Sequence, residues 1–190
     1  MKVGNFYLDN ANLLNHLRQL FGRREQGGAV IDYGKLCLAV KEELEGYFNE
    51  PVRVLELYLY DGFVKNDEEK RLKKARFVFS VEKRLKEACP EVSFKPRLFE
   101  VYLGKGKRLK GDDVQLALDV CNDARDKGLN FVALFSGDGD FESLLEHLEL
   151  RYPELVRVVV SFKTFCSKCL YDRAHYFIDL EELIKSVRFA

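Results

Sequence analysis

The chain has 190 residues, of which 47% are hydrophobic and 33% charged. This size and balance are typical of one globular domain with a substantial core, and they exclude a disordered chain. No apolar run is long enough to cross a membrane, so we expect no membrane partner. The 31 basic and 31 acidic residues cancel, so any affinity for nucleic acid must come from local clusters of charge.

The N-terminus indicates an intracellular protein, which we expect in the cytoplasm. The first six residues lack the long apolar stretch and the cleavage site of a signal peptide. Five widely spaced cysteines, an odd number, do not describe a disulfide framework. Cys166 and Cys169 form a lone C-x-x-C pair without two further ligands at matching spacing, so a zinc site is not favoured.

The first third of the chain alternates strands with helices. Residues 3–9 are a short apolar run that predicts a buried strand, and a helix is expected over 12–20. A second helix over 32–48 begins at Asp32, which is suited to cap it. Its apolar face consists of Tyr33, Leu36, Cys37, Val40, Leu44 and Tyr47. Residues 53–60 are rich in strand formers and predict the next strand.

The middle of the chain is highly charged. Asp61 and Gly62 are expected to end the strand before it, and a long helix over 67–88 is stopped by Pro90. Its expected core stripe consists of Leu72, Ala75, Phe79 and Leu85. Residues 92–103 predict a strand that is irregular around Pro96, and a basic, glycine-rich loop follows it over 104–111.

The last third again alternates the two kinds of element. A helix over 112–127 is expected to face inward with Val114, Ala117, Leu118, Cys121 and Ala124. The remaining predicted elements are a strand over 131–136, a turn over 137–140, a helix over 141–150, a strand over 156–162, a short helix, a short strand over 175–178 and a helix over 179–187. This alternation predicts a single α/β domain over residues 1–190, a three-layer sandwich with a central, mostly parallel sheet flanked by helices.

Acidic side chains follow two of the predicted strands. Asp9 comes directly after the first strand, and Asp138 and Asp140 follow the strand over 131–136. In open α/β sheets, ligand sites lie at this carboxyl edge. Carboxylates about 4 Å apart repel by roughly 1 kcal/mol in water and by about 4 kcal/mol at an effective dielectric near 20. A shared proton or a bound cation offsets such repulsion, and Mg²⁺ or Mn²⁺ prefers these oxygen ligands.

Asp113 is expected to join this group from the start of its helix, whereas Asp112 is better interpreted as the N-cap. An aspartate at a strand end or helix start is, taken alone, most often a turn or capping residue. The joint pattern, an acid after one strand, two after another and one behind a basic loop, favours a metal site.

Three segments carry a resemblance to a known family. They are FYLDNAN from Phe6 to Asn12, KGDDV from Lys110 to Val114 with LALD up to Asp119, and LFSGDGDF from Leu134 to Phe141. Together and in this order they resemble the NYN family of the PIN-like nuclease superfamily. The resemblance implies a compact α/β sandwich with a metal-dependent ribonuclease site.

Carried over residue by residue, the resemblance makes Asp9, Asp113, Asp138 and Asp140 the catalytic acids that bind Mg²⁺ or Mn²⁺. A cation bound there lowers the pKa of a water and stabilises the leaving oxygen. Asn12 would support the first acid or contact the substrate. Asp119 matches a recurrent acid of the family, but the predicted helix face points it away from the others. The family often has Ala-Asp where this chain has Ala174-His175.

The expected substrate is RNA, with single-stranded DNA as an alternative. Lys107, Arg108 and Lys110 lie just before the Asp113 helix and are placed to hold the phosphate backbone. Lys110 also carries part of the family motif. The resemblance further suggests a homodimer.

Two other functions fit parts of the pattern. The first is a PIN-like domain that binds RNA or protein without cutting it, with the charged helix over 67–88 as its surface. The second is a phosphatase of the haloacid dehalogenase type, which also uses an aspartate after the first strand. That class needs a second aspartate two residues later, where this chain has Ala11.

Overall fold

The structure is a computed structural model that describes residues 1–22, 31–64, 67–101 and 111–187. Its strands are β1 (Lys2–Asp9), β2 (Val52–Val64), β3 (Ser93–Val101), β4 (Phe131–Phe135), β5 (Val156–Ser161) and β6 (Tyr176–Asp179). Its helices are α1 (Asn10–Phe21), α2 (Tyr33–Phe48), α3 (Glu68–Ala88), α4 (Asp112–Asp126), α5 (Glu142–Arg151), α6 (Lys168–Arg173) and α7 (Leu180–Val187). Short 3₁₀ helices span η2 (Gly139–Phe141) and η3 (Lys163–Phe165).

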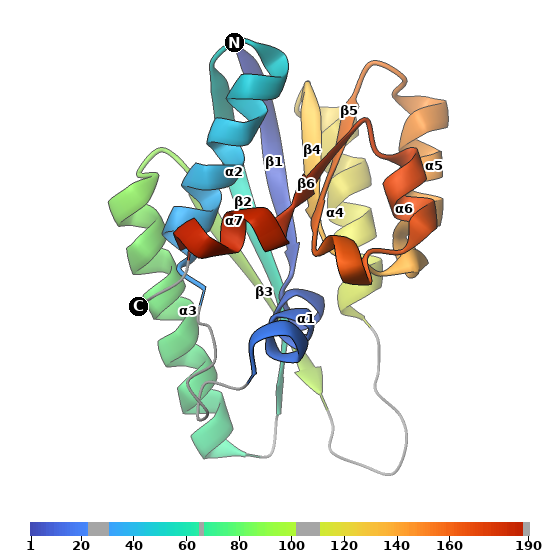
Figure 1. Ribbon diagram of the computed structural model, residues 1–190. Coiled ribbons are helices and arrows are strands. Elements are labelled where there is room, and N and C mark those ends of the chain that lie inside the picture. The colour runs from blue at the N-terminus through green and yellow to red at the C-terminus, as the bar shows by residue number, and fades with distance from the viewer. Residues whose placement is uncertain (23–30, 65–66, 102–110, 188–190) are drawn as a thin grey trace.

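The strands of the described residues form one six-stranded sheet in the order β3-β2-β1-β4-β5-β6. Every neighbouring pair is parallel. Helices cover both faces, with α2, α3 and α7 on one and α4, α5 and α6 on the other (Figure 1). The predicted three-layer α/β sandwich is therefore confirmed, and the sheet is parallel throughout.

The core divides into two clusters because successive residues of a strand point to opposite faces. Phe6 and Leu8 of β1 belong to the cluster that packs under α2, and Tyr7 between them belongs to the cluster that packs under α4. All three side chains are fully buried. β1 thus lies at the centre of the molecule, and its last residue is fixed by packing on both sides.

The order of the strands brings the ends of β1, β2 and β4 together. The chain runs outward from β1 through β2 to β3 and then returns to the other side of β1 with β4. Asp9 pairs with Tyr60, and Leu8 pairs with Phe135. The ends of β1 and β4 and the adjoining part of β2 around Tyr60 therefore lie at the point where the strand order reverses, where parallel sheets bind their ligands.

Several helix and strand details differ from the predictions. The expected stripe of α3 holds only at Leu85, which is buried, as is Val81; Leu72 and Phe79 are 51% and 69% exposed. β2 does not end at Asp61 but continues to Val64, because β3 pairs with β2 from Glu56 to Val64. Pro96 lies in β3, an edge strand that needs hydrogen-bond donors on one side only.

The inward face predicted for α4 is right only in part. Ala117, Cys121 and Ala124 pack against the core, but Val114 and Leu118 are more than half exposed. The buried residues of the helix are Leu116, Asp119, Val120 and Asp123. Two of these four buried residues are aspartates, which a hydropathy scale ranks as exposed. A prediction from hydropathy therefore assigns a neighbouring face of the helix to the core. Asp112 is not the N-cap, because Gly111 takes that position and Asp112 lies in the first turn.

Other predictions hold. Asp32 caps α2, with Oδ1 accepting hydrogen bonds from the backbone amides of Gly34 and Lys35 at 3.0 and 3.2 Å. The predicted core face of α5 is buried; it consists of Phe141, Leu144, Leu145 and Leu148. Within the residues described, no helix combines the length and the apolar character needed to cross a bilayer.

Candidate functional site

Asp9 lies at the centre of the candidate site. It is the last residue of β1 and the N-cap of α1, so one carboxylate both ends the strand and begins the helix. Its Oδ1 accepts a hydrogen bond from the backbone amide of Asn12, and its Oδ2 accepts one from Ser136 Oγ, both at 3.0 Å. Only 8% of the residue is exposed. The carboxylate is therefore held in one orientation at the carboxyl edge of the sheet.

The surroundings of Asp9 favour a cation. Burial raises the pKa of its carboxyl to about 6, the hydrogen bonds from Asn12 and Ser136 oppose this rise, and the charges of Asp113 and Asp112 add to it. The carboxyl is still ionised at neutral pH, so a partly desolvated negative charge stands among other negative charges. A positive ion bound there relieves both the burial and the repulsion.

A short loop after β4 is tied to α1 beside Asp9. The backbone amide of Gly137 donates to Asn12 Oδ1 at 3.1 Å, and the amide of Asp138 donates to Ser136 Oγ at 3.2 Å. A Cβ atom on Gly137 would lie 2.7 Å from Ser161 Oγ, so the loop can pass here only as glycine. Asn12, a predicted substrate-binding residue, thus has a structural partner in this loop.

Three of the four predicted acids line one groove. Asp9, Asp113 and Asp138 share a groove of about 850 Å³, which Asp112 and Asp61 also line. Asp140 is exposed on η2 and lies outside the residues that line this groove. Its backbone amide donates to Asp138 Oδ1 at 3.1 Å, which fixes the turn that presents Asp138.

The donor set fits a divalent cation in kind. Carboxylates are ligands that Mg²⁺ and Mn²⁺ prefer, and Mg²⁺ is commonly held by one or two carboxylates with several waters. Across the described part of the chain, no three His, Cys, Asp or Glu side chains stand close enough together to form a ready metal cage. The groove therefore offers carboxylates that are spaced apart, a donor set that suits an ion retaining several waters.

Asp61 is a groove residue that the sequence interpretation missed. It is 7% exposed, and its Oδ2 accepts hydrogen bonds from Asn10 Nδ2 at 2.5 Å and Lys74 Nζ at 2.6 Å. The Asp-Gly pair favours a turn, which predicts the end of the strand at this point. The apolar residues Phe63 and Val64 after it were the signal that the strand continues and carries Asp61 to the level of Asp9.

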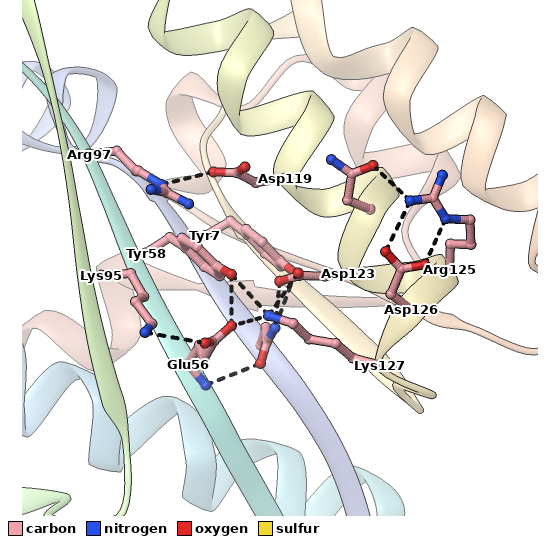
Figure 2. Close-up of polar contacts among 12 residues, drawn as sticks. Tyr7, Glu56, Tyr58, Lys95, Arg97, Asp119, Asp123, Arg125, Asp126 and Lys127 are labelled. Carbon is pink, nitrogen blue, oxygen red and sulfur yellow. Dashed lines mark hydrogen bonds and ion pairs between the residues drawn. The ribbon is translucent and has the colours of Figure 1, made fainter.

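Asp119 and Asp123 point into the protein from α4, contrary to the outward orientation predicted for Asp119 (Figure 2). Asp119 accepts hydrogen bonds from Tyr60 Oη at 2.8 Å, Arg97 Nε at 3.1 Å and Gln115 Nε2 at 2.8 Å. These contacts join α4 to β2 and β3. Asp119 is not among the residues that line the groove.

Asp123 makes similar contacts with β1, the strand next to β2. It accepts hydrogen bonds from Asn5 Nδ2 at 2.7 Å and Tyr7 Oη at 2.8 Å, and Lys127 Nζ lies 2.8 Å from it. The ring of Tyr7 stacks on Tyr58 with centroids 5.1 Å apart. Asp119 and Asp123 thus hold α4 against the sheet. The first turn of this helix contains Asp112 and Asp113, which line the groove.

A smaller hollow of about 370 Å³ shares Asn12 and Asp138 with the groove, and His16 lines it. The ring of His16 stacks on Phe165 with centroids 4.6 Å apart. His147 is exposed, and His175 Nδ1 accepts a hydrogen bond from the amide of Arg157 at 3.1 Å. The predicted substrate-binding residues Lys107, Arg108 and Lys110 lie outside the described residues.

The sheet is parallel, and acids that follow β1 and β4 lie at its switch point. This arrangement defines the class of the protein as an α/β sandwich of PIN-like layout. The family model of the NYN domain matches residues 7–181. The chain therefore belongs to the NYN domain family, a family of PIN-like nucleases. This membership removes the support for the phosphatase alternative.

The chain is also similar to a crystal structure of a protein of unknown function from Vibrio parahaemolyticus. The two share 20% identity with a TM-score of 0.65, over 99% of this chain and 96% of the other. At this identity the likeness shows the fold alone. None of the curated proteins matches the chain.

Proposed function

We propose that this protein is a metal-dependent ribonuclease that hydrolyses RNA phosphodiester bonds, with Mg²⁺ or Mn²⁺ as its cofactor. The observation that carries the proposal is the shared groove of Asp9, Asp113 and Asp138, in which Asp9 is buried and its pKa is raised toward neutrality. The family is one of nucleases, which supports hydrolysis at the coarse level. Single-stranded DNA is the alternative substrate.

Asp9 is the residue best prepared to hold a cation. Each of its carboxylate oxygens accepts one hydrogen bond, at 3.0 Å, and a carboxylate has about four lone-pair positions. Two positions therefore remain for a ligand, while the bonds from Asn12 and Ser136 prevent the side chain from rotating. When bound, the cation would lower the pKa of a water and stabilise the leaving oxygen.

The other acids differ in how directly they would contact the cation. Asp113 and Asp138 line the groove from α4 and from the loop after β4, so they would complete the metal site. Asp112 lines the same groove and adds negative charge near Asp9. Asp140 stays a candidate ligand at the outer edge, from where it would act on a water or a second ion.

Cleavage of end-labelled RNA tests the proposal. The full-length protein is assayed with Mg²⁺, with Mn²⁺ and with EDTA, beside Asp9→Asn and Asp138→Asn. Asp172→Asn, at an exposed position away from the groove, is the matched control. We expect metal-dependent cleavage that falls by roughly 100-fold or more in the two groove variants, the scale for losing one electrostatic group at a reacting centre.

The same assay separates the alternative function. RNA binding without cleavage under any metal would favour a silent binding module. Cleavage that survives in EDTA, or that is unchanged in Asp138→Asn, would contradict the assigned site.

A further inference from the structure

One wall of the groove is basic although the chain as a whole is neutral. Arg18 in the last turn of α1 and Lys70, Lys73 and Lys74 in the first two turns of α3 line the groove together with the acids. Figure 1 shows α1 and the start of α3 at the same end of the sheet, where β1 and β2 finish. The acids belong to strand ends and α4, so the groove has one anionic and one cationic side.

The lysines of this wall differ in how tightly they are held. Lys74 Nζ lies 2.6 Å from Asp61 Oδ2, with side chains only 22% and 9% exposed. This pair is a structural contact between α3 and β2. Removing one partner of a buried pair leaves an uncompensated charge, so Lys74 is not available to a ligand.

Lys70 and Lys73 each form an ion pair at the surface. Lys70 contacts Asp67 at 2.9 Å and is 56% exposed, and Lys73 contacts Glu69 at 2.6 Å and is 69% exposed. Exposed pairs of this kind contribute about 0–1 kcal/mol. A phosphate can therefore replace the carboxylate partner of either lysine at little cost in free energy.

Aromatic rings lie in the same groove. Phe63 at the end of β2 and Phe77 on α3 both line it and are half-buried. Lys74 Nζ lies 5.4 Å from the centre of the Phe77 ring. Rings beside a row of cations are the arrangement that binds single strands, because unpaired bases present their faces for stacking whereas a duplex hides them.

We infer that the first two turns of α3 guide a single-stranded nucleic acid to the acidic side of the groove. Lys70 and Lys73 bind successive backbone phosphates, Phe63 and Phe77 offer surfaces to the bases, and Lys74 keeps α3 docked on β2. This inference rests on the proposed function for its choice of polyanion. It does not depend on hydrolysis, because the lysine contacts need neither metal nor the acids.

Binding measured without cleavage tests the inference. The full-length protein is titrated in EDTA against a fluorescein-labelled oligouridylate, read by anisotropy from about 50 to 200 mM salt, the range in which phosphate contacts dominate. The double variant Lys70→Gln/Lys73→Gln is compared with Lys83→Gln/Lys86→Gln. The control lysines are on the same helix, are 66% and 70% exposed, pair with glutamates of that helix, and do not line the groove.

The logarithm of the affinity decreases with the logarithm of the salt concentration, and each phosphate contact on a single strand contributes about 0.7 to the steepness of this decrease. We therefore expect the decrease to be less steep by about 1.4 in the groove variant. Affinity at about 0.1 M salt should fall roughly tenfold or more, and the control should match the wild type. Thermal unfolding of each variant confirms that it is folded before binding is compared.

Four results would overturn the inference. They are an unchanged slope in the groove variant, an equal loss in the control, binding of a duplex as tight as the single strand, and equal competition by polyglutamate. A wild type that binds through Lys70 and Lys73 but does not cleave RNA with any metal would instead refute the proposed nuclease and leave this surface in place.

Discussion

The hydroxyl of Ser136 donates a hydrogen bond of 3.0 Å to Oδ2 of Asp9, although the two residues lie 127 positions apart in the chain. The contact exists because β1 and β4 are neighbours and both end at the switch point of the sheet. It links the motif of the first strand to the Ser-Gly-Asp motif after β4. A hydrogen bond to the ionised form of a carboxyl lowers its pKa, so Ser136 keeps Asp9 charged despite its burial.

Ser136→Ala removes this support. We expect the pKa of Asp9 to rise further, so the acidic limb of the pH–rate profile should move to higher pH. Cleavage near pH 6 should fall roughly threefold to tenfold, with a smaller change at pH 8, because one pKa unit is a tenfold change in protonation. A uniform loss at all pH values would contradict this role and indicate a purely structural contact.

Asp9→Asn should stabilise the metal-free protein above pH 6. The folded-state pKa of Asp9 is raised from 3.8 to about 6, so the folded state binds more protons than the unfolded state between these values. Stability is therefore lost as the pH rises through this window, by roughly 3 kcal/mol at most. The asparagine variant carries no charge and escapes the loss. Thermal unfolding in EDTA at pH 4.5 and pH 7.5 checks the difference, and a variant less stable than wild type at pH 7.5 would contradict it.

Divalent metal should stabilise the wild type selectively. A ligand that binds only the folded state adds about 2.7 kcal/mol at 100 times its dissociation constant. We expect Mg²⁺ or Mn²⁺ to raise the unfolding temperature of the wild type and of Asp172→Asn, but not of Asp9→Asn. An equal rise in all three proteins would mean that the ion binds elsewhere. Sodium chloride at the same ionic strength is the control for charge screening.

Asp119 should act as a positioning residue. Asp119→Ala leaves Tyr60 Oη and the Arg97 guanidinium without their partner, 2.8 and 3.1 Å away in the wild type. Losing a buried hydrogen-bonded charge costs on the order of 2–4 kcal/mol. Tyr60→Phe, which removes one hydrogen bond, should cost about 1 kcal/mol. Urea unfolding measures both values.

The same variants distinguish positioning from metal binding. We expect Asp119→Ala to retain the stabilisation by metal, because Asp119 does not line the groove. Its cleavage rate should fall because α4 holds Asp112 and Asp113 less firmly. Loss of the metal-induced shift in a folded Asp119→Ala protein would contradict this role and make Asp119 a ligand.

The layout of the fold could be predicted because hydrophobic patterning and topology are strongly coupled in parallel sheets. Continuous apolar runs such as residues 131–135 are buried on both faces, and the alternation with helices leaves few arrangements of the strands. The convergence of Asp9 and Asp138 was predictable for the same reason, whereas Asp140 does not line the groove. The motifs of Asp9 and Asp138 lie at the carboxyl ends of strands, and in a parallel sheet these ends lie at the same edge.

The faces of α3 and α4 could be assigned only in part. On α4 the buried face carries Asp119 and Asp123, whose partners Tyr60 and Tyr7 come from strands far away in the chain. No periodicity of hydropathy reveals such a pair. Asp61 was missed for a related reason, since an Asp-Gly pair favours a turn locally but parallel pairing with β3 carries the strand through it.

The proposed nuclease needs a divalent cation among Asp9, Asp113 and Asp138, and anomalous diffraction from crystals of the active protein grown with Mn²⁺ can locate it. We expect one manganese peak in the groove, within about 2.1 Å of a carboxylate oxygen of Asp9 and in contact with Asp138 directly or through water. A protein that cleaves RNA with Mn²⁺ but shows no peak there, or shows a lysine ammonium group in that position, would contradict it.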